Sequence, residues 1–168
     1  MSTSRRDSGS PEMFTVKQDA IARCRSYRKD HGLYGVVDAA LGRIMLEVGS
    51  VGAVVMPAAL GARVRDLLAR AQEHSGPVIE HPRSGRWTFL TGPTDNSYTD
   101  TTLFSDLFRV CASVALPGST LVLPSPSDEL GGYRRWIHPP HRDFRPLFGD
   151  VVAATQACSA RIKAPAVE

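Results

Sequence analysis

The chain has 168 residues, of which 42% are hydrophobic and 22% charged, and its formal net charge is +3. This length is typical of one globular domain, and the small positive charge excludes a strongly acidic surface without by itself indicating a nucleic-acid partner. No apolar run reaches the roughly 18–20 residues that a membrane span needs, and the polar N-terminal stretch lacks the apolar core of a signal peptide. We therefore expect a cytoplasmic protein with no membrane partner.

The ends of the chain are expected to be tails around a single domain. Residues 1–13 are rich in Ser, Arg and Pro without periodicity, and residues 161–168 show no helical or strand pattern. No internal repeat or interdomain linker interrupts residues 14–160. Cys24, Cys111 and Cys158 form no CxxC pair, so we expect buried free thiols rather than a disulfide framework or a cysteine-based zinc site.

Hydrophobic spacing predicts the elements of the first half of the chain. Thr15 and Gln18 form a capping box at the start of a helix over residues 15–29, which ends at His31-Gly32. Extended apolar runs follow at 33–37 and 44–48. A third run, at 52–56, stops at Pro57, which is well placed as the first residue of a second helix. The inward side chains of that helix are expected to be Leu60, Val64, Leu67, Leu68 and Ala71.

The second half of the chain begins with a predicted hairpin. Residues 77–80 and 86–90 form two short strands around a turn rich in Pro, Ser and Gly. A short amphipathic helix is expected at 103–108, strands at 109–116, 119–124 and 133–137, and a last helix from residue 147. Because strands and helices alternate without a regular βαβ rhythm, the pattern favours an α+β domain with a mixed sheet flanked by helices.

Motifs of the common enzyme classes are absent from the sequence. It contains no Walker loop, no GxGxxG after a strand, no HExxH and no GxSxG. His138 and His141 are close enough in sequence to share a metal ion, but two prolines separate them and no third ligand stands nearby, so exposed loop histidines are the favoured interpretation. We assign no cofactor, no metal site and no catalytic residue.

The segment GGYRRWIHPPHRDFR, residues 131–145, interleaves arginines with aromatic residues. Arginine side chains bridge phosphates and aromatic rings stack on unpaired bases, so this composition suits a surface for single-stranded nucleic acid. The structural alternative is a Trp packed beside the core under Arg stems. A second basic cluster lies in the hairpin turn, where a solvated turn is the alternative. The candidate binding residues are Arg83, Ser84, Arg86, Arg134, Arg135, Trp136 and Arg142.

The order of several short motifs resembles a known family. These motifs are Gly76-Pro77-Val78, Ser84-Gly85, Pro117-Gly118, Pro124-Ser125, and Arg135-Trp136-Ile137 with Pro139-Pro140. From the region of Gly52 to Pro140, the chain resembles the N-terminal domain of bifunctional DNA primase-polymerases as it occurs in actinobacterial proteins. The resemblance implies a primase-polymerase-like, RRM-related fold and a replication-associated protein as the typical partner.

The positions that carry catalysis in that family are changed in this chain. The family places carboxylates for two divalent cations on the strand that here reads Val54-Val55-Met56, and a later acidic position reads Ser113-Val114-Ala115. Arg86-Trp87-Thr88 stands where the family has a phosphate-contacting histidine. Without charged oxygen ligands, magnesium or manganese ions have nothing to hold them. The resemblance therefore implies a catalytically degenerate module that binds nucleic acid or a nucleotide.

Two other functions stay open. One is a protein-interaction domain, such as a homo-oligomer, in which the apolar residues 54–56 have become core. The other is an active nucleotidyltransferase whose metal ligands have moved to Glu47 and Asp38, the nearest acidic residues.

Overall fold

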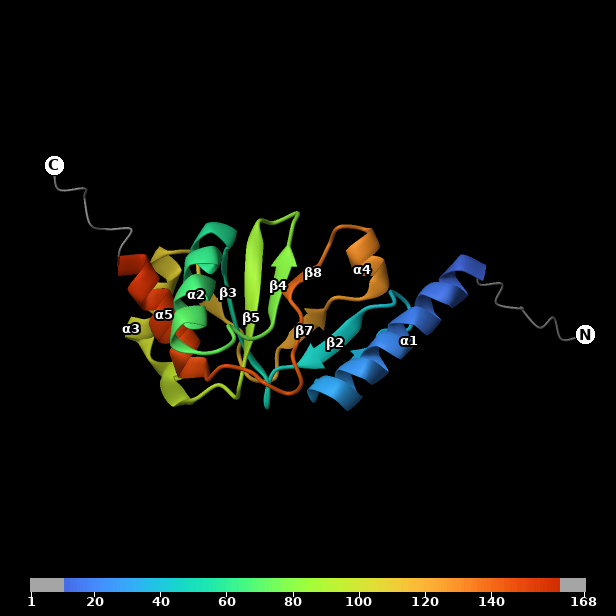
Figure 1. The fold of residues 1–168 in the computed structure, drawn as a ribbon, viewed down its shortest axis with the longest axis horizontal. Helices are drawn as coiled ribbons and strands as arrows, with labels where there is room; N and C mark the ends of the chain where they lie inside the picture. The colour runs from blue at the N-terminus through green and yellow to red at the C-terminus, as the bar shows by residue number, and fades with distance from the viewer. Residues whose placement is uncertain (1–10, 161–168) are drawn as a thin grey trace, which may run out of the picture.

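The computed structural model describes residues 11–160, which form an α+β domain with one three-stranded and one five-stranded sheet (Figure 1). The elements in chain order are α1 (Pro11–His31), β1 (Val36–Val37), β2 (Ile44–Glu47), β3 (Gly52–Pro57), α2 (Ala58–Ala71), β4 (Val78–His81), β5 (Arg86–Thr91), the 3-10 helix η1 (Asn96–Thr99), α3 (Thr101–Arg109), β6 (Ser113–Val114), β7 (Thr120–Leu123), α4 (Pro126–Leu130), β8 (Arg135–His138) and α5 (Phe148–Ala160). Among these helices, none has both the length and the apolar composition that a membrane crossing requires.

The five-stranded sheet has the order β6-β3-β5-β4-β8, and every strand pair in both sheets is antiparallel. The expected mixed sheet is therefore wrong. The prediction fails because β5 lies between β3 and β4 in the sheet. The crossover through α2 consequently joins two strands that point the same way but share no hydrogen bonds.

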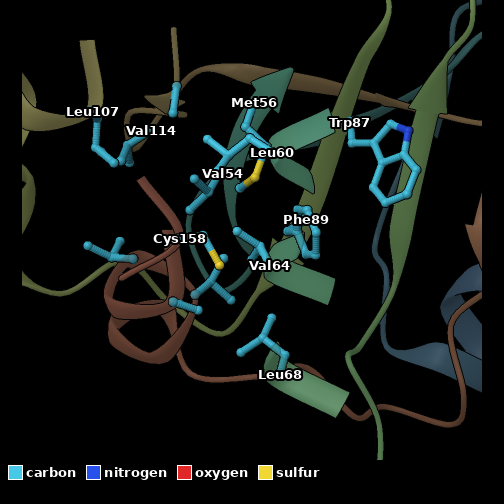
Figure 2. Close-up of a cluster of buried hydrophobic side chains, with 14 of the residues drawn as sticks. Val54, Met56, Leu60, Val64, Leu68, Trp87, Phe89, Leu107, Val114 and Cys158 are labelled. Atoms are coloured by element: carbon cyan, nitrogen blue, oxygen red, sulfur yellow. The ribbon is translucent and has the colours of Figure 1, made fainter. Parts of the chain in front are cut away.

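One face of the five-stranded sheet is covered by α2, α3 and α5 (Figure 1). Figure 2 shows how Val54 and Met56 of β3 and Phe89 of β5 meet the apolar side of α2 in this first core. Since side chains alternate along a strand, Val55 points to the opposite face. The first core thus fixes which residues of β3 and β5 remain for the second face.

The second face is covered only in part. Ala53, Ile79 and Leu90 pack there in a second core against α1 and the three-stranded sheet, whose order is β1-β2-β7. Tyr27 of α1 joins this core and donates a hydrogen bond from its hydroxyl to the carbonyl oxygen of Pro124 at 2.7 Å. The contact attaches α1 to the end of β7.

Several boundaries differ from the sequence-based prediction. The first helix begins at Pro11 rather than at residue 15, so residues 11–13 of the predicted tail are helical; the rest of both predicted tails lies outside the described residues. Pro57 ends β3 with an extended ψ of 145°, and α2 begins one residue later. The strand predicted at 109–116 shortens to Ser113–Val114 because α3 continues to Arg109 and the chain then turns, with Cys111 at a φ of 56°. Cys24 and Cys158 are buried free thiols, whereas Cys111 is exposed.

Candidate functional site

Beside the second core, the second face carries a row of three residues across neighbouring strands, of which Ser113 is exposed, Val55 is half-buried and Thr88 is buried. Val55 of β3 pairs with Ser113 of β6 on one side and with Thr88 of β5 on the other. The primase-polymerase resemblance would place metal ligands on β3 and β6 and the phosphate-contacting histidine on β5. The row brings together a hydroxyl, an isopropyl group and a second hydroxyl, with no carboxylate among them.

His81 adjoins this row from the end of β4. Its Nε2 lies 2.8 Å from the Oγ1 of Thr88. Burial lowers the pKa of His81 below its ordinary value, and the positive charges of Arg134 and Arg86 lower it further, while Asp128 acts in the opposite direction. The imidazole is therefore held neutral at pH 7 in surroundings where positive charge predominates.

Arg83 and Arg86 flank the β4–β5 turn and have uncharged partners. The Nη2 of Arg83 donates to the carbonyl oxygen of Gly131 at 3.0 Å, and its guanidinium lies 3.7 Å from the centroid of the Tyr133 ring. The Nη2 of Arg86 donates to the carbonyl oxygen of Cys111 at 2.8 Å. Neither arginine forms a salt bridge with a described residue, so neither positive charge is compensated by a carboxylate.

Arg134 and Arg135 lie beside the turn but are paired with carboxylates. The Nη1 of Arg134 lies 3.1 Å from the Oδ1 of Asp128, whose side chain is only 7% exposed. Arg135 of β8 pairs with Glu80 of β4. Because each carboxylate cancels most of the charge of its arginine, these two residues offer less to a phosphate than Arg83 and Arg86 do.

Trp136 and Arg142 do not join this group. The Nε1 of Trp136 donates to the Tyr27 hydroxyl at 2.8 Å, and the two rings meet edge to face beside the second core. Arg142 follows the far end of β8, where its carbonyl oxygen lies 2.9 Å from the Nδ1 of His31. Ser84 is exposed in the turn, and its hydroxyl lies 3.3 Å from the carbonyl oxygen of His81. The structure therefore gathers Arg83, Ser84, Arg86, Arg134 and Arg135 at the turn.

Asp128 is the residue of this region that sequence reasoning missed. It is the third residue of α4, a short helix inside the Pro- and Ser-rich loop, and Ser125 caps this helix by accepting a hydrogen bond from the Asp128 amide. The Oδ2 of Asp128 is buried with no partner among the described residues. The signal in the sequence was the spacing Ser125-x-x-Asp128, which resembles a capping box.

The histidines considered as metal ligands lie in a different place. His138 and His141 line a cavity of about 220 Å³ between the end of α2 and the loop before α5, and the His74 ring lies 5.3 Å from that of His141. His138 is half-buried rather than exposed, which lowers its pKa. Among residues 11–160, no group of three or more His, Cys, Asp or Glu side chains is arranged to hold a metal ion.

The alternative ligands Asp38 and Glu47 are also kept apart. Asp38 lies in the turn after β1, where its Oδ1 accepts the amide of Ala40 at 2.8 Å. Glu47 lies at the other end of β2, opposite Thr120. Their separation along β2 gives a shared metal ion no support.

Comparison of the chain with models of known protein families, with curated proteins and with solved structures found no match. The likeness to primase-polymerases therefore rests on the motifs in the sequence and stays a prediction.

Proposed function

We propose that the protein binds single-stranded nucleic acid, or a nucleotide, at the β4–β5 turn and does not polymerise it. The contact surface, called here the arginine surface, consists of Arg83, Ser84, Arg86 and the adjoining Arg134 and Arg135. The observation that carries the proposal is the pair of uncompensated charges on Arg83 and Arg86, each held in place by a hydrogen bond to a neutral carbonyl. Arginines fixed in this way lose little conformational entropy when they bind a phosphate.

The start of α2 adds to the positive potential beside the turn. The amide of Ala58 donates to the carbonyl oxygen of Gly85 at 2.8 Å, so the helix begins against the turn itself. No side chain caps this end of α2, and its first turn contains no acidic residue. The partial positive charge of the helix N-terminus is therefore not offset by a neighbouring carboxylate.

The topology also supports the proposal. The succession β3-α2-β4-β5-α3-β6, with neighbours in the order β6-β3-β5-β4, is the arrangement that RRM-related folds share. RRM domains bind RNA on the sheet face that their helices leave free, by stacking bases on aromatic side chains. Here β3 and β5 carry Val55 and Thr88 on that face instead of aromatic rings, and Thr88 is only 4% exposed. We therefore expect contacts to phosphates to dominate, with little preference for base sequence.

The test is a fluorescence-anisotropy titration of a labelled single-stranded oligonucleotide at low and near-physiological salt. The label must be on the oligonucleotide because Trp87 is buried and Trp136 is partly buried. We expect Arg83→Ala and Arg86→Ala each to weaken binding and to reduce the slope of log affinity against log salt by about 0.7. Arg135→Ala, which removes an arginine already paired with Glu80, should have a smaller effect.

Arg109→Ala is the matched control, because Arg109 is exposed on α3 and pairs with Asp106 within the same helix. Its affinity and salt slope should equal those of the wild type. If Arg83→Ala and Arg86→Ala also leave both quantities unchanged, the arginine surface does not bind nucleic acid. Competition by an unlabelled nucleoside triphosphate separates a nucleotide site from a strand-binding site.

A protein-interaction domain is the second candidate function. Val54 and Met56 have no exposed surface, which agrees with the idea that this strand serves the core. Large apolar side chains are exposed elsewhere, among them Phe14, Tyr34, Phe108 and Leu130. Scattered exposed residues are common, so they favour a partner only where they adjoin a groove. Partner binding that survives nuclease treatment and high salt would favour this function, whether the partner is a second copy or a replication-associated protein.

A further inference from the structure

A groove of about 370 Å³ lies between α1 and β1, on the part of the molecule that carries the three-stranded sheet. Its walls include the apolar side chains of Ile21, Val36 and Val37 and the thiol-bearing Cys24. Figure 1 shows α1 at the end of the molecule opposite α3 and α5, with β4 and β5 between them. The groove is thus a separate feature from the arginine surface.

Three cations surround the apolar part of the groove. Lys17, Arg25 and Arg28 line it, and no Asp or Glu does. Arg28 donates to the carbonyl oxygen of Gly35 at 3.2 Å, and its guanidinium lies 5.8 Å from the Tyr34 ring centroid. None of the three forms a salt bridge with a described residue. The groove therefore presents uncompensated positive charge above an apolar floor.

The lining residues of α1 share one helical face that continues beyond the groove. Lys17, Ile21, Arg25 and Arg28 follow a spacing of three or four residues, and the same spacing leads back to Phe14, which is 66% exposed. Val36 of β1 is similarly exposed, at 63%. From Phe14 to Arg28 the face is roughly 20 Å long at about 1.5 Å per residue. This length exceeds a small metabolite and fits a peptide segment.

We propose that the groove between α1 and β1 is a docking site for a short acidic segment of a partner protein that places apolar side chains on Ile21, Val36 and Val37. Charge complementarity identifies the occupant, because carboxylates would meet Lys17, Arg25 and Arg28 while the apolar side chains leave water. None of the residues that line the groove is aromatic; the exposed rings of Tyr34 and Phe14 lie beside it, so nucleic acid is kept as an outcome of the test. The proposal does not depend on the function of the arginine surface.

The experiment selects peptides of about 16 residues from a random display library on the immobilised full chain. The strongest peptide is then synthesised with a fluorescent label and titrated by anisotropy against variants. We expect the enriched peptides to combine Asp and Glu with Leu, Ile or Phe, and their affinity to fall as salt is raised. A selection that enriches no such peptides overturns the proposal.

Lys17→Ala and Lys29→Ala form a matched pair, since both remove one lysine from α1 but only Lys17 lines the groove. Lys17→Ala should weaken peptide binding by roughly 2- to 5-fold, as for one exposed ion pair, and Lys29→Ala should not change it. Ile21→Glu should weaken it more than about 10-fold by placing a carboxylate on the apolar floor.

Thermal unfolding followed by circular dichroism shows whether Ile21→Glu is folded, and Lys17→Ala keeps the test valid if it is not. Wild-type affinity in Lys17→Ala and in folded Ile21→Glu would overturn the proposal. The same holds if single-stranded DNA displaces the peptide and loses affinity in both variants, because the groove would then bind nucleic acid. Loss of DNA binding confined to Arg83→Ala and Arg86→Ala leaves this proposal intact and concerns only the arginine surface.

Discussion

Gly61 lies inside α2, where replacement of glycine by alanine normally stabilises a helix by about 1 kcal/mol. A Cβ atom at this position would lie 2.7 Å from Cε3 of Trp87, because the indole ring packs directly against the helix backbone. We expect Gly61→Ala to lower the free energy of unfolding by roughly 1–3 kcal/mol, since overpacking outweighs helix propensity. Urea denaturation measures the change. Gly149→Ala is the control, because the added methyl group meets only the Oδ2 of Asp95 at 3.7 Å, and it should be neutral or stabilising.

His81 makes stability depend on pH. Its pKa in the folded protein lies below the ordinary value of 6.5, so the unfolded chain binds the proton more readily. The contribution of neutral His81 to stability is therefore complete above pH 6.5 and decreases as the pH falls below it. We expect the unfolding free energy to drop between pH 7 and pH 5, and His81→Gln to flatten this drop. Equal pH profiles of the unfolding free energy for the variant and the wild type would contradict the lowered pKa of His81 in the folded protein.

Predictions for single residues were correct where they depended only on neighbours in the sequence. The turn at Ser84-Gly85 was predicted from residue types, and Gly85 indeed has a φ of +63°. The role of Trp136 depended on Tyr27, which lies over a hundred positions away in the chain, and no local pattern contains that information. Both interpretations of Trp136 were therefore open in the sequence, and the long-range contact favours the structural one.

At the scale of elements, α4 controls how much charge Arg134 presents. Asp128→Asn would remove the carboxylate that neutralises Arg134 and would weaken a buried contact. We expect the variant to be less stable by roughly 1–3 kcal/mol yet to bind single-stranded DNA more tightly. Anisotropy and urea denaturation on the same preparation test both halves. Weaker DNA binding by folded Asp128→Asn would contradict the place of Arg134 in the arginine surface.

The hairpin β4–β5 and the helices α2, α3 and α5 could be predicted because hydrophobic period and turn residues are local signals. The order of the strands could not. Gly52 of β3 pairs with Thr91 of β5, and β8 joins β4 from a distant part of the chain. Apolar runs indicate that a strand exists but not which strand it pairs with, and the predicted mixed sheet was therefore wrong.

At the scale of the molecule, two positively charged regions lie on different structural units. The arginine surface belongs to the five-stranded sheet, and the groove belongs to α1 and the three-stranded sheet. The small net charge of +3 gave no indication of either, because it sums over carboxylates located elsewhere. Charge placement, which depends on tertiary structure, is what distinguishes a binding surface from average composition.

The pairing of β2 with β7 has a consequence for synthesis of the chain. Ile44 of β2 lies opposite Leu123 of β7, so the N-terminal third of the protein cannot complete its sheet until much of the rest has left the ribosome. During that interval, one edge of β2 has unpaired backbone groups next to apolar side chains, which is the condition under which nascent chains associate. Late translation of β7 therefore makes the nascent chain, rather than the finished fold, the stage most exposed to aggregation.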